Sequence, residues 1–115
     1  MPNHPDSNNI YSVSTLNQSV ANLLEQKFGW IWVEGEISNL AQPASGHIYF
    51  SLKDNAAQVI CAMFKGRNRS VSFQPKNGNQ VLVRAKVSLY QPRGNYQLIV
   101  DRMEQAGDGA LRLQF

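Results

Sequence analysis

The chain has 115 residues, of which 43% are hydrophobic and 17% charged, a composition typical of one globular domain with a modest core. No segment approaches the roughly 18–20 consecutive apolar residues of a membrane span, and the polar start does not resemble a secretion signal, so we expect a cytoplasmic protein without membrane contact. The single cysteine, Cys61, excludes an intrachain disulfide, and with only two histidines no metal-ligand cluster is visible, so we predict no metal and no cofactor.

The net charge of +3 is distributed unevenly along the sequence. Between Lys53 and Arg102 there are nine basic and two acidic residues, a net charge of +7, whereas the rest of the chain carries −4. Such a basic region is typical of a surface that binds a polyanion. The plain alternative is a set of solvated cations on ordinary strands.

The first predicted element is an amphipathic helix at residues 14–28, which follows a polar, flexible leader at residues 1–10. Ser14 or Thr15 is the predicted N-cap, and Gly29 stands where a helix ends. The apolar residues of this segment recur at the spacing of one helical face, namely Leu16, Val20, Leu23, Leu24 and Phe28. This pattern predicts a helix that packs on another element.

Beyond Gly29 the apolar spacing changes from a helical period to the alternation of strands. The five predicted strands cover residues 30–38, 45–54, 58–64, 80–90 and 96–105. Gly35, in the middle of the first strand, predicts a bend of the kind that lets a strand wrap around a closing barrel. The facing of the fifth strand is ambiguous because Leu98, Ile99 and Val100 are contiguous.

A helix followed by five strands predicts an all-β fold with one N-terminal helix, a five-stranded Greek-key barrel of the OB-fold type. The basic connection between the third and fourth strands is predicted to attach to the core through Val71 and Phe73. An open five-stranded sheet packed on the helix is the alternative. Residues 11–106 would form this domain, and residues 107–115 would begin a linker.

The residue types needed for hydrolytic catalysis are present but poorly arranged. Ser45, His47, Ser51 and Asp54 lie on one extended segment, which cannot fold them onto one another, and no nucleophile-elbow sequence occurs. Glu34 and Glu36 point the same way on one strand, where we expect ordinary salt-bridge partners rather than an acid and a base. We therefore predict no catalytic residue in this chain.

Residue types that bind single-stranded nucleic acid are better represented. Cations follow the phosphates and bases stack on aromatic faces, each stack contributing about 1–3 kcal/mol. Each aromatic residue also has a structural alternative to base stacking. Trp32 and Phe64 would lie under the helix, and Tyr49 and Tyr90 would pack against a neighbouring strand. The predicted nucleic-acid contacts, on outward strand positions and in turns, are Trp32, His47, Tyr49, Lys53, Phe64, Lys65, Arg67, Arg69, Arg84, Lys86, Tyr90, Arg93 and Tyr96.

Four segments resemble the N-terminal domain of the exodeoxyribonuclease VII large-subunit family: YSVSTLNQSV, WVEGEISNLAQPASGHIYFSLKD, VICAMFKG and LYQPRGNYQLIVDRMEQAG. The resemblance runs from about Tyr11 to Gly109. It implies an OB-fold that binds single-stranded DNA for a bacterial exonuclease, whose catalytic region and small-subunit contacts lie outside these residues. The full-length protein would hydrolyse single-stranded DNA, and this chain alone would not.

Two other functions fit the same pattern. The chain is alternatively a protein-interaction or self-association module, for which Ile60 and Leu82 would supply exposed apolar groups. The same residues also fit an RNA-binding barrel of the anticodon type. The sequence contains no pattern that indicates whether a 2′-hydroxyl is recognised, so it does not distinguish RNA from DNA.

Overall fold

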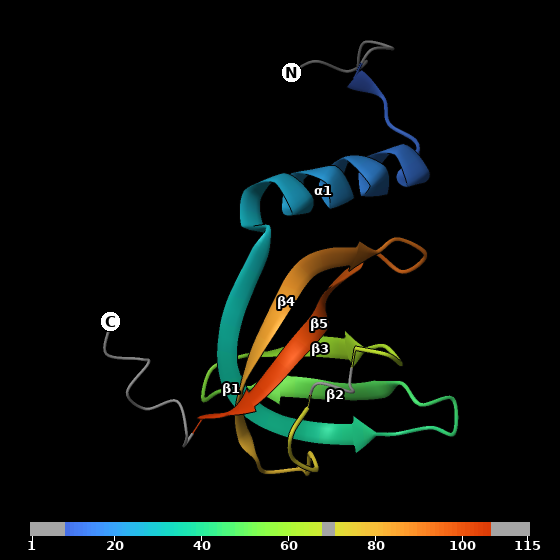
Figure 1. Cartoon of the computed structure of the whole chain (residues 1–115). Helices are drawn as coiled ribbons and strands as arrows, with labels where there is room; N and C mark the ends of the chain where they lie inside the picture. Colours follow the sequence, from blue (N-terminus) through green and yellow to red (C-terminus); the bar gives the residue numbers. More distant parts are fainter. Residues whose placement is uncertain (1–8, 68–70, 107–115) are drawn as a thin grey trace.

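The computed structural model describes residues 9–67 and 71–106, in which one helix precedes five strands that close into a barrel (Figure 1). The order around the barrel is β1-β2-β3-β5-β4; β3 and β5 run parallel, and the other neighbouring pairs are antiparallel. The predicted barrel is confirmed, and the open sheet is excluded. The elements are α1 (Val13–Phe28), β1 (Trp30–Ala41), β2 (Ile48–Lys53), β3 (Gln58–Met63), β4 (Gln80–Tyr90) and β5 (Asn95–Gln105).

Several predictions fall on residues outside the described part of the chain. The leader falls there at residues 1–8, and so do Arg69 and the linker at residues 107–115. Within the described part, no helix is long and apolar enough to cross a membrane.

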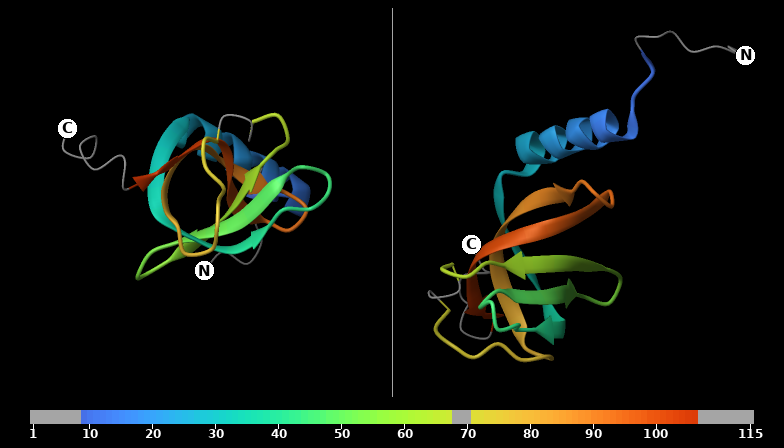
Figure 2. Two further views of the ribbon diagram at one scale, coloured as in Figure 1. Left: turned by 60° about the horizontal axis from the view of Figure 1, so that its bottom comes forward. Right: turned by 90° about the vertical axis from the view of Figure 1, so that its right-hand side faces the viewer.

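The barrel interior is filled by alternate residues of the strands, and Figure 2 (left) shows the strands circling it. Alternate residues of β4 point inward: Val81, Val83, Ala85 and Val87 are buried, and Leu89, at the next inward position, is partly buried. Cys61 is a core residue, and burial raises the pKa of its thiol to about 12, which keeps it unreactive. The buried cluster consists of Ile37, Ile48, Phe50, Leu52, Cys61, Met63, Val81, Val83, Ala85, Val87, Leu98, Val100 and Met103.

Gly35 lies where β1 changes partners. Up to Glu36 this strand pairs with β4, and from Glu36 onward it pairs with β2. A Cβ atom on Gly35 would lie 2.8 Å from Leu52 Cγ and 3.0 Å from the carbonyl oxygen of Lys53. Only glycine permits this approach of the two backbones, which explains the predicted bend.

A β-bulge decides the facing of β5. Arg84 of β4 pairs with Arg102 and Ala85 pairs with Val100, so Asp101 is the extra residue. The bulge shifts the alternation, and the buried residues are therefore Leu98 and Val100 before it and Met103 after it. This settles which residues of the apolar run at 98–100 face the core. Leu98 and Val100 do, whereas Ile99 between them points outward and is only partly buried.

One end of the barrel is closed by the connection between β3 and β4. Val71 and Phe73 are partly buried against the core, as predicted, and Pro75 is buried. The described residues of this connection, 64–67 and 71–79, form no α-helix, and part of the connection is seen below the strands in Figure 1.

Helix α1 lies beside the end of β4 and the β4–β5 turn in both Figure 1 and Figure 2. Leu24 packs against the core, the Asn17 side-chain amide donates to the carbonyl of Gln91 at 2.8 Å, and Lys86 Nζ lies 3.5 Å from Glu25 Oε1. The predicted packing of one helical face is confirmed only in part, because Leu16, Leu23 and Phe28 remain about half exposed.

The predicted N-cap of this helix is wrong. Ser12 is the cap, and its hydroxyl accepts a hydrogen bond from the Thr15 backbone N–H at 3.0 Å. Ser14 and Thr15 are already helical, since the helix begins at Val13. Gly29 ends the helix as predicted, with a φ of +55° that favours glycine.

Candidate nucleic-acid interface

Three rings lie together on the wall of the barrel formed by β2 and β3. The His47 ring meets Tyr49 and Phe64 edge-on, with centroid distances of 6.2 and 5.4 Å. We call these residues the aromatic cluster; Tyr49 is 38% and Phe64 41% exposed. Ring faces that are partly open to solvent beside one another are suited to stacking with flat ligands.

Strand register explains why the cluster forms. Ile48 and Met63 form the last pair of the β2–β3 ladder. The next residues beyond this pair, His47 and Phe64, therefore lie opposite each other at its end. The backbone N–H of Lys65 donates to His47 Nδ1 at 2.8 Å. This hydrogen bond fixes the ring orientation and leaves the proton of the neutral ring on Nε2.

Cations flank the aromatic cluster on both sides. Lys53 is exposed at the end of β2, and Lys65 and Arg67 follow β3. Neither Lys53 nor Lys65 forms an ion pair in the part of the chain that the structure describes. Asp54, next to Lys53, instead accepts the backbone N–H groups of Ala56 and Ala57, which lower the pKa of its carboxyl. We call the outward residues of this wall, from His47 to Lys53 and from Gln58 to Lys65, the β2–β3 face.

A second group of aromatic and basic residues lies on a different wall, between β1 and β4. Trp30 pairs across the strands with Lys86, and Trp32 pairs with Arg84. The Arg84 guanidinium lies 4.8 Å from the Trp30 ring centroid and 3.3 Å from an oxygen of Asp101, while Lys86 pairs with Glu25. We call Trp30, Trp32, Arg84 and Lys86 the β1–β4 face. Its cations are already held by aromatic and acidic partners within the protein.

Neither Trp32 nor Phe64 lies under the helix, since they are 49% and 41% exposed. Trp30 is 45% exposed and was missed by the sequence analysis, although its position two residues before Trp32 was a sufficient signal. Leu82 was expected to be exposed and is only 7% exposed; it pairs with Glu34 of β1 on one side and with Glu104 of β5 on the other. Ile60, expected to be exposed, is 52% exposed.

The predicted contacts near the β4–β5 turn lie apart from the aromatic cluster. Tyr90 is 48% exposed, and its carbonyl accepts the N–H groups of Arg93 and Gly94. Tyr96 has the inward parity of Leu98 but stands at an open part of the barrel wall, where it is 56% exposed. The predicted residues therefore do not share one face, as the sequence pattern suggested.

The two glutamates of β1 make no ion pair within the described residues, so their predicted role as salt-bridge partners is wrong. Glu34 instead accepts a hydrogen bond from the Gln80 side chain at 3.2 Å, and Glu36 lies opposite Lys53 in the strand register. No group of three or more His, Cys, Asp or Glu that could hold a metal occurs among the described residues.

A family model described as an OB-fold nucleic acid binding domain matches residues 11–104. The chain belongs to this family. The OB-fold domain also has close relatives among exodeoxyribonuclease 7 large subunits. It is 60% identical over 109 residues to that of Pectobacterium carotovorum and 61% identical over 107 residues to that of Vibrio vulnificus. These matches cover 95% and 93% of the chain, and they confirm the resemblance predicted from the sequence segments.

The OB-fold domain spans about a quarter of the length of these relatives, 24% in both cases. Among solved structures, it is similar to a chain of a replication protein A heterotrimer bound to single-stranded DNA, with a TM-score of 0.55 and 14% identity over 67% of this chain and 57% of that one. Asparaginyl-tRNA synthetase from Pyrococcus horikoshii gives a TM-score of 0.52 and 13% identity over 66% of this chain and 19% of that one. At such identities these similarities concern the fold alone.

Proposed function

We propose that this chain is a single-stranded-DNA-binding domain of an exodeoxyribonuclease VII large subunit. One observation carries the proposal: the aromatic cluster lies on the β2–β3 face with Lys65 next to it and Lys53 at the other end of the ladder, and neither lysine forms an ion pair in the described part of the chain. This wall and its flanking loops are the surface on which OB-folds bind oligonucleotides. Ring faces for bases and cations for phosphates are the two components of sequence-tolerant single-strand binding.

The individual residues take different roles in this proposal. We assign base stacking to Tyr49 and Phe64, with His47 supporting them edge-on. Phosphate contacts fall to Lys53, Lys65 and Arg67, and to Arg69, which lies outside the described residues. The other predicted contacts lie on other parts of the barrel, and we expect them to contribute less to binding. They are Trp32, Arg84, Lys86, Tyr90, Arg93 and Tyr96.

The names of the relatives support a role within a longer nuclease. In that protein the domain would position single-stranded DNA for exonucleolytic hydrolysis by a catalytic region outside this chain, and small subunits would bind outside it as well. The proposed substrate implies the bacterial cytoplasm. The chain alone should leave a labelled oligonucleotide intact under conditions in which the full-length enzyme degrades it.

Fluorescence anisotropy with a labelled oligothymidylate of about 15 nucleotides tests the proposal directly. We expect binding in the micromolar range or tighter at about 50 mM salt and clearly weaker binding at about 200 mM, because phosphate contacts release counterions. Equal affinity for duplex DNA, or no binding at either salt concentration, would contradict it.

Two further measurements separate the alternative functions. RNA and DNA oligonucleotides of one sequence, in competition, distinguish an RNA-binding barrel, which would prefer RNA. Light scattering distinguishes a self-association module, which would remain dimeric at high salt and show no affinity for DNA.

A further inference from the structure

Strand β3 has an edge that is only partly paired. Its six residues all pair with β2, but only Cys61 and Ala62 pair with β5. Within the described residues, the edge from Gln58 to Ile60 therefore has no partner strand. Continuing the parallel register backward along both strands brings Tyr96 beside Val59. The barrel wall is open at this point.

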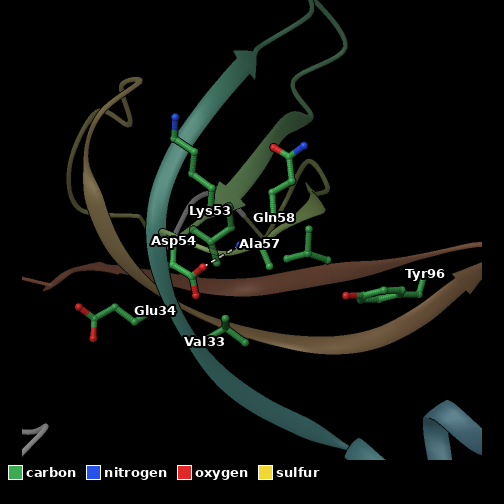
Figure 3. Close-up of a pocket in the computed structure, with 9 residues that line it drawn as sticks. Val33, Glu34, Lys53, Asp54, Ala57, Gln58 and Tyr96 are labelled. Carbon is green, nitrogen blue, oxygen red and sulfur yellow. Dashed lines mark hydrogen bonds between the residues drawn. The ribbon is translucent and has the colours of Figure 1, made fainter.

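Two hollows meet at this opening, and Gln58, Val59 and Tyr96 line both of them. Figure 3 shows the first hollow, with Tyr96 on one side and Lys53 at the β2–β3 hairpin on another. The second hollow lies on the outer side of β3, where Ser51, Ile60, Gly94 and Asn95 complete its lining. Both hollows border the unpaired edge of β3 and share three lining residues, and we treat them together as one depression.

The walls of this depression combine apolar and polar chemistry. The Tyr96 ring and the branched Ile60 side chain line the same hollow and are 56% and 52% exposed, so both are accessible to a ligand. The side-chain amides of Gln58 and Asn95 offer both donors and acceptors, and Ser51 adds a hydroxyl. A flat heterocycle with donors and acceptors on its edge matches this set, and a nucleobase is such a heterocycle.

We propose that this depression, the β3–β5 slot, binds one base of the single strand that crosses the β2–β3 face, with the base packed between Tyr96 and Ile60. This inference rests on the proposed function and deepens it. Ser51 pairs with Ile60 and Tyr49 pairs with Ala62, so the slot begins two residues along the sheet from the aromatic cluster, about 7 Å away. A neighbouring nucleotide of the same strand can reach it.

A protein strand added to the edge of β3 is the competing occupant. The edge offers only the three residues from Gln58 to Ile60 for such pairing, and its rim carries Lys53, which suits a phosphate. The geometry therefore favours a nucleotide over a peptide.

The test uses the 115-residue chain, the variant Tyr96→Ala and labelled oligothymidylates of the shortest length that still binds with full affinity, which fixes the register, each with one abasic position that is moved along the strand. On the unmodified strand we expect Tyr96→Ala to weaken binding about tenfold. For the strand whose abasic position falls in the slot, wild type and variant should bind equally. Tyr11→Ala removes an equally exposed tyrosine, 57% against 56%, and should change neither affinity.

The outcomes separate the slot from the proposed function. If wild type fails to bind the unmodified strand, the proposed function itself fails. If wild type binds and Tyr96→Ala binds equally well, the slot is overturned while the function stands. An equal loss for every abasic position would show that Tyr96 acts through the fold or that a protein strand is the occupant, and it would also overturn the slot. A second variant, Ile60→Ser, should reproduce the position-dependent loss without touching Tyr96.

Discussion

The β2–β3 face and the β1–β4 face carry the same kinds of residue but differ in how those residues are partnered. Both present exposed aromatic rings beside basic side chains. On the β1–β4 face Arg84 is held by Trp30 and Asp101, and Lys86 by Glu25. On the β2–β3 face Lys53 and Lys65 have no such partners among the described residues.

This difference is the reason why we propose the β2–β3 face, and not the β1–β4 face, as the surface that binds a polyanion. A cation already paired with a carboxylate must leave that partner before it can meet a phosphate, whereas an unpaired cation exchanges only counterions. Composition and strand parity do not distinguish the two faces, because the acidic partners come from α1 and β5, elsewhere in the sequence.

We expect the largest loss of affinity when the two stacking rings of the β2–β3 face are removed. The double variant Tyr49→Ala with Phe64→Ala should weaken binding of single-stranded DNA about 100-fold, since each ring contributes about 1–3 kcal/mol of stacking. Anisotropy titration measures this loss, and a thermal melt shows whether the barrel stays folded. The matched double variant Trp30→Ala with Trp32→Ala should cost much less affinity; an equal loss would erase the distinction between the faces.

The junction between the two faces is the next most sensitive position. Gly35→Ala should lower the free energy of unfolding by about 1–3 kcal/mol, because the new methyl group overlaps Leu52 where β1 leaves β4 for β2. Urea denaturation measures the change. As a control, Gly66→Ala tests a positive φ without a close neighbour, and it should cost less. Equal stability of Gly35→Ala and wild type would show that the strands separate easily there.

On the β1–β4 face, Arg84→Ala should reduce stability more than it reduces binding. Asp101 is 13% exposed in its side chain, and one of its oxygens is buried without a hydrogen-bond partner, so loss of Arg84 leaves a desolvated carboxylate unpaired. We expect the free energy of unfolding to fall by about 1–3 kcal/mol. Urea denaturation and anisotropy on the same sample compare the two effects. A large loss of affinity with unchanged stability would place Arg84 in the DNA contact instead.

The smallest effect concerns single phosphate contacts. Lys65→Ala should weaken binding several-fold and lower the slope of log affinity against log salt by about 0.7, the contribution of one phosphate contact on a single strand. Titrations at several salt concentrations measure this slope. Lys27→Ala removes the same charge from α1 and should leave the slope unchanged. If both variants shift the slope equally, the effect is one of net charge and not of a specific contact.

Much of the fold could be predicted because its signals are local. The helix, the five strands and the inward residues of β4 follow from the spacing of apolar residues, and Gly35 marked the bend before the contact with Leu52 was known. The β5 bulge could not be predicted, because the extra residue Asp101 is defined only by the pairing of β5 with β4. The exposed side of α1 could not be predicted either, since amphipathicity does not say how much of a helix its neighbour covers.

The candidate site divides in the same way. The sequence by itself determined which residues point outward on β2 and β3, and therefore that Tyr49 and Lys53 lie on one wall of the barrel. Tertiary structure alone decided that Phe64 and His47 meet, that Arg84 and Lys86 are paired, and that Tyr96 stands at an opening in the wall. The physical reason is that the direction of a side chain follows from backbone alternation within one strand, whereas its partners follow from the register and closure of strands far apart in sequence.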